Sequence, residues 1–157
     1  MQQDTDNLVM WSEMWQLPFN VSKCKMLHLG RTNPNHVYTM ASCNINQTSG
    51  EKNLGVMIDD QLKFHKHVAI NVSKARRLLG LISKCFINLT PQTFPYLYKS
   101  IVRPCLEYGN IIWEPNYKVD EDLVEKVQRY ATKLVPLISH LPYEEQLKCL
   151  KLPSLKY

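Results

Sequence analysis

Apolar and polar positions change their spacing near the middle of the chain. Residues 54–58 (LGVMI) form a short apolar run with the length and composition of a strand buried on both faces. Asp59 and Asp60 end this run. From Val68 to Phe86, apolar residues recur every three or four positions, which is the period of a helix with one buried stripe. The pattern therefore predicts a strand that leads into a long amphipathic helix.

The pattern before residue 54 predicts one helix and two further strands. Apolar residues at helical spacing predict a helix over residues 4–15. Residues 24–29 and 37–40 read as two short strands, and the stretch 42–52 is polar and turn-rich. A helix followed by short, tightly connected strands predicts an antiparallel sheet with one helix on it.

After residue 61 the pattern is helical to the end of the chain. It predicts helices over residues 92–113, 120–134 and 143–150. Pro104 lies inside the first of these helices, and its missing amide should kink the helix near residues 100–101.

These elements predict an α+β protein of two domains. An N-terminal helix on a small antiparallel sheet occupies residues 1–60, and an all-helical bundle occupies residues 61–157. The 157 residues, of which 45% are hydrophobic, are enough for one modest core. The last apolar residues have no further chain to pack against, so we expect the bundle to be truncated at the C-terminus.

Positive charge is concentrated in the middle third of the chain. Residues 61–113 carry eight basic residues and one acidic residue, whereas residues 1–60 carry four and six. Such a patch suits a polyanion, because each neutralised phosphate releases counterions. A solvated helix face would have the same composition, so both interpretations stay open. The candidate nucleic-acid-binding residues are Lys63, Lys66, His67, Lys74, Arg76, Arg77 and Lys84.

Residue pairs that look like catalytic or metal sites lack the partners that such sites need. Asp59 and Asp60 follow an apolar run, but two-metal chemistry requires carboxylates from separate strands. We expect a turn in which an aspartate side chain bonds nearby amides. His65 and His67 have no third donor at a metal-binding spacing. The sequence therefore predicts no catalytic residue and no metal site.

Four aromatic residues in the segment 92–113 have two interpretations. Tyr96, Tyr98, Tyr108 and Trp113 could stack on the bases of a single strand. At helical spacing such side chains more often belong to a core. Composition alone does not separate the two.

Cysteines and apolar runs indicate the environment of the protein. Its five cysteines, an odd number without a CxxC pair, favour a reducing compartment and buried thiols over a disulfide framework. No run approaches a membrane span, and the first residues lack a signal-peptide pattern. We expect an intracellular protein, nuclear or cytoplasmic, that is neither secreted nor attached to a membrane.

The order of several short motifs is similar to that of a known family. These motifs are WSEMWQLPFNVSKCK at 11–25, NLGVMID at 53–59, LYKSIVRP at 97–104 followed by LEYG at 106–109 and Trp113, VQR at 127–129, and YEEQL at 143–147. Together they span almost the whole chain. In this order they resemble the C-terminal part of the reverse transcriptases of non-LTR retrotransposons, the jockey-like long interspersed elements.

The resemblance implies the end of a polymerase palm followed by a thumb. It implies that residues 1–60 close the palm and that residues 61–157 form the thumb, which closes on the template–primer duplex. Asn20 and Lys23 resemble part of the last palm motif. The residues that resemble the primer grip are Leu54, Gly55 and Val56.

The family's catalytic aspartates lie in an aromatic-Ala-Asp-Asp motif, which this sequence does not contain. By resemblance that motif would precede Met1, and Mg²⁺ is expected only in a full-length relative, so no cofactor is expected here. We therefore expect a fragment of an RNA-directed DNA polymerase that does not polymerise alone. It should bind an RNA–DNA hybrid or duplex nucleic acid through phosphates. Its protein partners should be the missing palm and fingers of the parent polymerase. The alternative is a retrotransposon-derived helical module for protein interaction or structure, with no nucleic-acid role.

Overall fold

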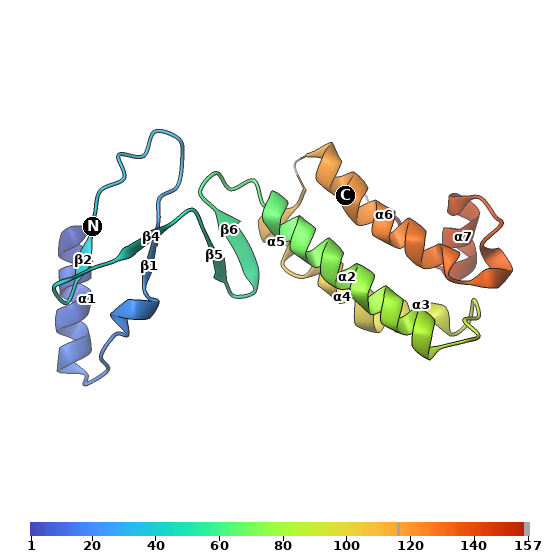
Figure 1. The fold of residues 1–157 in the computed structure, drawn as a ribbon, viewed down its shortest axis with the longest axis horizontal. Helices are drawn as coiled ribbons and strands as arrows, with labels where there is room; N and C mark the ends of the chain where they lie inside the picture. The colour runs from blue at the N-terminus through green and yellow to red at the C-terminus, as the bar shows by residue number, and fades with distance from the viewer. Residues whose placement is uncertain (116, 156–157) are drawn as a thin grey trace. The chain divides into compact units, whose positions relative to one another are not determined.

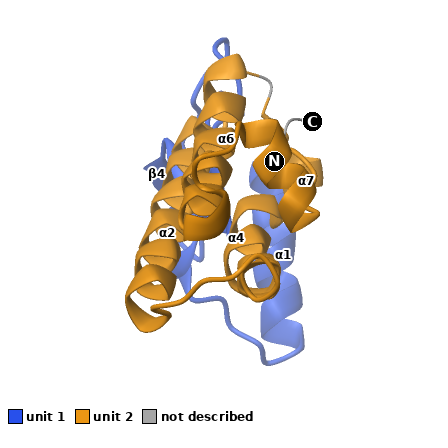
Figure 2. Cartoon of the chain, turned by 90° about the vertical axis from the view of Figure 1, so that its right-hand side faces the viewer, with its two compact units in different colours: residues 1–62 blue, residues 63–157 orange. Residues whose placement is uncertain are grey.

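Strands and helices occupy different parts of the chain. The computed structural model describes residues 1–115 and 117–155. The chain divides into two compact units, Met1–Leu62 (unit 1) and Lys63–Tyr157 (unit 2) (Figure 2). Unit 1 contains a helix and the strands, and unit 2 contains the remaining helices (Figure 1). The predicted α+β class is confirmed.

Unit 1 starts with a helix that is tied to a strand. The predicted N-terminal helix is confirmed as α1 (Gln2–Met14). The Gln2 side-chain amide donates to the Thr39 carbonyl at 3.0 Å, and its oxygen accepts from the Thr39 amide at 3.0 Å. The elements after α1 are the 3₁₀ turn η1 (Val21–Lys23) and the strands β1 (Lys25–Leu27), β2 (Thr39–Met40), β3 (Cys43–Asn44), β4 (Asn46–Thr48), β5 (Gly50–Asn53) and β6 (Val56–Asp59).

The strands form three two-stranded pairs instead of the predicted single antiparallel sheet. β2 pairs with β3, and β5 with β6, in antiparallel fashion, whereas β1 pairs with β4 in parallel. The stretch 42–52, predicted as turns, supplies β3, β4 and most of β5. β3 and β4 are mostly exposed, so no hydrophobic alternation marks them in the sequence.

The apolar run at 54–58 is divided between a turn and a strand. Leu54 and Gly55 join β5 to β6 with φ angles of 46° and 89°, and the register places Asn53 opposite Val56. A two-residue turn with positive φ at both positions has the twist that a hairpin needs, and Gly55 adopts it without steric cost. Val56 is buried, whereas Leu54 is 86% exposed. The prediction of a doubly buried strand is therefore wrong for the first two residues.

The regular structure described in unit 2 is helical. The long helices are α2 (His65–Cys85) and α6 (Lys118–Lys133). The shorter elements are α3 (Phe94–Leu97), the π-helical turn η2 (Tyr98–Val102), α4 (Arg103–Glu107), α5 (Asn110–Trp113), the 3₁₀ turn η3 (Pro136–Ile138) and α7 (Tyr143–Leu150). None of the helices in the described residues combines the length and apolar composition needed to cross a membrane.

The helix predicted over residues 92–113 is interrupted twice. The kink expected from Pro104 is confirmed as η2, because a proline has no amide for the carbonyl four residues earlier and the helix widens there. A second break occurs at Gly109, whose φ of 69° lies outside the helical range and starts α5. The prediction of one kinked helix is therefore wrong, because separate helical segments replace it.

The core of unit 2 lies where α2 packs against α4, η2 and α6. Tyr98 and Trp113 are almost fully buried there, whereas Tyr96 and Tyr108 are 78% and 57% exposed. Each fully buried large apolar side chain contributes about 1.5–3 kcal/mol to stability. The core interpretation of the aromatic residues thus holds for two of the four. The apolar residues that these four elements bury are Val68, Val72, Ala75, Leu79, Ile82, Val102, Leu106, Val124, Val127 and Ala131.

The cysteines are free, as predicted, but most of them are not buried. Cys43, Cys85 and Cys149 are exposed, and the other two are half-buried. The prediction of buried thiols is wrong because the elements that carry these residues turn them away from the core.

Candidate nucleic-acid interface

The outer face of α2 carries a row of basic and apolar side chains. Because α2 buries Val68, Ala75 and Leu79 against its neighbours, the opposite positions face solvent. At helical rise the positions from 66 to 84 span about 27 Å. The exposed side chains that recur there every three or four residues, called the outer stripe here, are Lys66, Ile70, Lys74, Arg77, Leu81 and Lys84.

The four cations of the outer stripe have no acidic partner among residues 1–115 and 117–155. The ion pairs found in those residues involve other side chains. α2 itself contains neither Asp nor Glu. Cations that are not neutralised by neighbours produce a positive surface potential, which attracts phosphates. This part of unit 2 therefore has the electrostatics of a polyanion-binding face.

Two of the predicted cations lie beside the outer stripe. Arg76 is exposed and lies toward α6, where it lines a hollow of about 420 Å³ with Leu123 and a second hollow of about 390 Å³ with Tyr130; Arg77 of the outer stripe also borders the first hollow. Lys63 precedes α2 and is half-buried. The predicted basic set is thus divided between the outer stripe and its margins.

Among the seven predicted nucleic-acid-binding residues, His67 is the one that the structure places in the core. Its side chain is only 2% exposed. The ring lies edge-on to Trp113 at 5.1 Å between centroids, and Nε2 is 2.9 Å from Nδ2 of Asn71. His67 therefore supports the packing of α2 and does not reach the surface.

A neighbouring histidine makes a contact that sequence reasoning missed. His65 Nδ1 lies 2.6 Å from the Asp120 carboxylate, which is buried, and the His65 ring packs on Tyr117 at 4.7 Å between centroids. This contact joins the first turn of α2 to the first turn of α6. The two residues are 55 positions apart, and no spacing in the sequence connects them.

The residues that resemble the palm motif and the primer grip lie on separate parts of unit 1. Asn20 and Lys23 are exposed at η1, where Asn20 Oδ1 accepts a hydrogen bond from the Ser22 hydroxyl at 2.6 Å. Leu54 and Gly55 form the tip of the β5–β6 hairpin. Val56, the third residue of the primer-grip set, starts β6 and is buried.

Asp59 and Asp60 form the predicted turn. The Asp59 carboxylate accepts a hydrogen bond from the Gln61 amide at 3.0 Å, and the Asp60 backbone bonds to Ser49 and Gly30 at 3.0 and 2.9 Å. In the part of the chain that the structure describes, no three His, Cys, Asp or Glu side chains gather closely enough to hold a metal ion.

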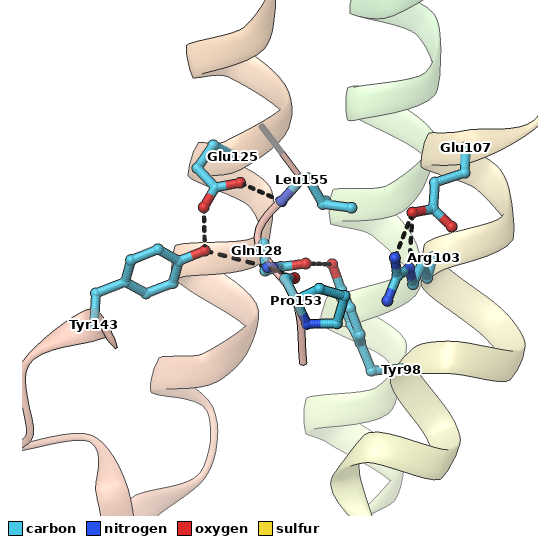
Figure 3. Close-up of polar contacts among 8 residues, drawn as sticks. All are labelled: Tyr98, Arg103, Glu107, Glu125, Gln128, Tyr143, Pro153 and Leu155. Carbon is cyan, nitrogen blue, oxygen red and sulfur yellow. Dashed lines mark hydrogen bonds and ion pairs between the residues drawn. The ribbon is translucent and has the colours of Figure 1, made fainter. Parts of the chain in front are cut away.

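A buried polar network fixes residues 152–155 against α6 (Figure 3). Gln128 accepts from the Tyr98 hydroxyl at 3.0 Å and donates to the Pro153 carbonyl at 2.8 Å. Glu125 accepts from the Tyr143 hydroxyl at 2.6 Å and from the Leu155 amide at 3.0 Å. Residues 152–155, which the pattern leaves without a packing partner, are therefore anchored, and Leu155 is 1% exposed.

Burial raises the pKa of both phenols in this network. For Tyr98 the main cause is loss of solvent, and the Tyr143 phenol and the Glu125 and Glu107 carboxylates add to it. For Tyr143 desolvation is again the largest cause of the raised pKa, and the second is the hydrogen bond to Glu125, which favours the neutral phenol. Both hydroxyls therefore act as hydrogen-bond donors over the whole neutral range.

Two curated proteins of Drosophila melanogaster are similar to most of this chain. A probable RNA-directed DNA polymerase from transposon X-element is 27% identical over 136 residues, which cover 82% of this chain and 14% of that protein. The RNA-directed DNA polymerase from mobile element jockey is 28% identical over 122 residues, which cover 69% of this chain and 12% of that protein. The resemblance to non-LTR retrotransposon polymerases is confirmed.

The similarity concerns a small part of these polymerases. The chain covers 14% and 12% of the two relatives' lengths. No family model matches the chain, and no solved structure matches it.

Proposed function

We propose that this chain corresponds to the part of a non-LTR reverse transcriptase that ends the palm and forms the thumb. In this proposal unit 2 binds an RNA–DNA hybrid or duplex without sequence preference through the outer stripe. The observation that carries the proposal is the row of cations on α2 that no described acid neutralises. The similarity to two RNA-directed DNA polymerases supports the same nucleic-acid ligand.

The side chains of the outer stripe suit backbone contacts better than base contacts. Lysine and arginine bind phosphates as charges, whereas sequence is read mainly by side chains that reach base edges. The grooves of an A-form helix leave phosphates and 2′-hydroxyls as the accessible features. A helix with four exposed cations along about 27 Å of one face therefore fits along one strand of such a duplex.

The hairpin tip supports a primer-grip role for unit 1. Leu54 is 86% exposed and has a left-handed backbone conformation. An apolar residue in this position contributes neither to a core nor to a favourable turn. Gly55 beside it has no Cβ, so the backbone can approach a sugar–phosphate closely. In this proposal the tip meets the primer end, and Lys23, with Asn20 nearby in the sequence, lies toward the phosphates of the incoming nucleotide.

The remaining palm and the fingers are the protein partners in this proposal. Leu8 and Trp11 of α1 and Trp15, which directly follows it, are 47%, 49% and 62% exposed, a large apolar surface for one short segment. Catalysis would come from aspartates outside this sequence, which would also hold the Mg²⁺ ions of a full-length relative. We propose that the chain alone does not polymerise.

A second candidate function follows from the apolar members of the outer stripe. Ile70 and Leu81 are 47% and 58% exposed between the cations. An exposed helix face with apolar anchors at regular spacing can bind a protein partner. A helical protein-interaction module derived from a retrotransposon is therefore the alternative.

Salt dependence distinguishes the two functions. We expect the logarithm of the affinity for an RNA–DNA hybrid to fall linearly with the logarithm of the salt concentration. In the double variant Arg77→Gln/Lys84→Gln this fall should be less steep, by about 0.7–0.9 in slope for each phosphate contact that is lost. The measurement is fluorescence anisotropy of a labelled hybrid with the full chain across a salt series.

A charge-matched control separates a specific face from net charge. The double variant Lys126→Gln/Lys133→Gln removes two exposed cations from α6. It should change the slope of the salt dependence little. Equal effects of the two double variants would mean that only the net charge matters. Hybrid binding that does not depend on salt would favour the protein-interaction module.

A further inference from the structure

A further hollow of unit 2 combines an exposed aromatic ring with cations. It lies between the start of α3 and the end of α7 and has a volume of about 430 Å³. Its lining includes Tyr96, Lys99 and Lys151, with Pro91, Pro95 and Leu150 as apolar walls. Cavities of about 300–1,000 Å³ are the usual size for small-molecule sites. The hollow is formed by elements other than α2 and is separate from the outer stripe.

The Tyr96 ring is available to a ligand. Its side chain is 78% exposed, whereas Tyr98, two residues later, is fully buried. A tyrosine ring that borders a hollow with proline walls presents a flat apolar face, and planar groups stack on such faces. The buried Leu150 closes the hollow on the side of α7.

The charges around the hollow favour an anionic ligand. Lys99 follows Tyr96 by one helical turn, and Lys151 ends α7 with a φ of 50°. Both lysines are exposed, and neither has an ion pair among the described residues. None of the described residues that line the hollow is acidic. The lining therefore offers a stacking face flanked by cations from two different elements.

We propose that this hollow binds one nucleotide unit, with the base stacked on Tyr96 and its phosphate held by Lys99 and Lys151. A nucleotide carries a planar base and a phosphate close enough together to contact neighbouring side chains at the same time. Phosphopeptides combine an aromatic ring with phosphate as well, but their recognition relies on arginine clusters, and no described lining residue is an arginine. The site takes an unpaired base and thus goes beyond the duplex contacts proposed for the outer stripe.

Nuclear magnetic resonance titration of the full chain tests the site. We expect thymidine monophosphate to shift the signals of Tyr96, Lys99 and Lys151, and inorganic phosphate or uncharged thymidine to bind more weakly. Tyr96→Ala should lower the affinity about tenfold, because a stacked base loses its platform. Tyr96→Phe should keep most of the affinity, since it keeps the ring.

Control variants separate this site from the outer stripe. Lys99→Gln/Lys151→Gln should weaken binding of the mononucleotide, whereas Lys148→Gln, an exposed cation of α7 outside the lining, should not. Arg77→Gln should also leave mononucleotide binding unchanged, so a failure of the outer-stripe proposal and a failure of this one give different results. Circular dichroism checks that each variant is folded.

The outcome also identifies the source of the nucleotide. Tighter binding of a short oligothymidylate than of the mononucleotide assigns the site to a single strand, and equal binding assigns it to a free nucleotide. The proposal is overturned by the absence of shifts at these residues at millimolar nucleotide. Inorganic phosphate that binds as well as the nucleotide, with no effect of Tyr96→Ala, would overturn it too, because the hollow would then hold an anion without a base.

Discussion

Gln128 is the residue that ties together the helices of unit 2. It is fully buried, yet its side chain bonds to residues from η2, α7 and the C-terminal segment (Figure 3). A buried amide without partners would cost about 1–3 kcal/mol, so these contacts specify one arrangement of the elements. The arrangement of η2, α6, α7 and residues 152–155 therefore depends on this network.

High pH should weaken the fold through Tyr98 and Tyr143. Burial raises the pKa of both phenols above their ordinary value of about 10. The folded state therefore holds these protons more tightly than the unfolded chain, so the stabilisation is complete below pH 10 and is lost as the pH rises above it. We expect the free energy of unfolding, measured by urea titration, to fall above about pH 10.

The double variant Tyr98→Phe/Tyr143→Phe is the control for this effect. The variant lacks both titrating groups. Its free energy of unfolding should be lower than that of the wild type and should depend less on pH in the same range. A wild-type protein whose stability falls no more steeply than that of the variant would contradict the expected linkage.

Single residues also mark the limit of sequence reasoning. The periodicity of α2 reveals which positions face the core, and Val68, Ala75 and Leu79 follow it. His67 does not, because its burial depends on Trp113, which lies far along the chain. Asp120 is equally hidden, since its partner His65 belongs to another helix. Polar side chains whose partners are distant in sequence carry no local signal.

At the scale of elements, the β5–β6 hairpin has a turn whose first residue is unfavourable. Type I′ turns prefer Asn-Gly, because asparagine tolerates left-handed backbone better than leucine does. Leu54 occupies that position with a φ of 46°. A sequence that gives up turn stability for an exposed apolar side chain is typical of a functional contact.

Replacing Leu54 with asparagine should stabilise the hairpin. We expect Leu54→Asn to slow the hydrogen exchange of the β5–β6 amides in the full chain about threefold to fivefold, equivalent to roughly 0.6–1 kcal/mol. Leu62→Asn is the matched control, because Leu62 is also exposed with positive φ but lies outside the hairpin. Unchanged or faster exchange in Leu54→Asn would show that the turn is not strained.

Prolines, glycines and the hydrophobic repeat explain which elements were predictable. Pro104 predicts the disruption that appears as η2, but Gly109 also ends the helix, and its effect depends on a left-handed backbone that the pattern does not reveal. The long helices were predicted because a 3.6-residue repeat persists over many residues. The pairing of β1 with β4 was not, since polar strands two or three residues long carry no alternation.

At the scale of the whole molecule, the charge distribution and the sequence similarity both support the nucleic-acid ligand that we propose. Six of the eight basic residues at 61–113 lie on the outer stripe or beside it in the structure. Composition could locate this excess but could not separate the row formed by Lys66, Arg77 and Lys84 from Arg76 at its margin. The structure makes that distinction, because it defines which side of α2 is packed.

The most direct test of the account is the footprint of an RNA–DNA hybrid on the full chain, mapped by nuclear magnetic resonance at low salt. The account predicts that backbone signals along the outer stripe shift together, from Lys66 to Lys84, and that the β5–β6 tip at Leu54 and Gly55 shifts with them. The same shifts should occur with hybrids of unrelated sequence. Shifts that avoid α2, or that follow the sequence of the hybrid, would contradict the central claim that this helix binds a nucleic-acid backbone.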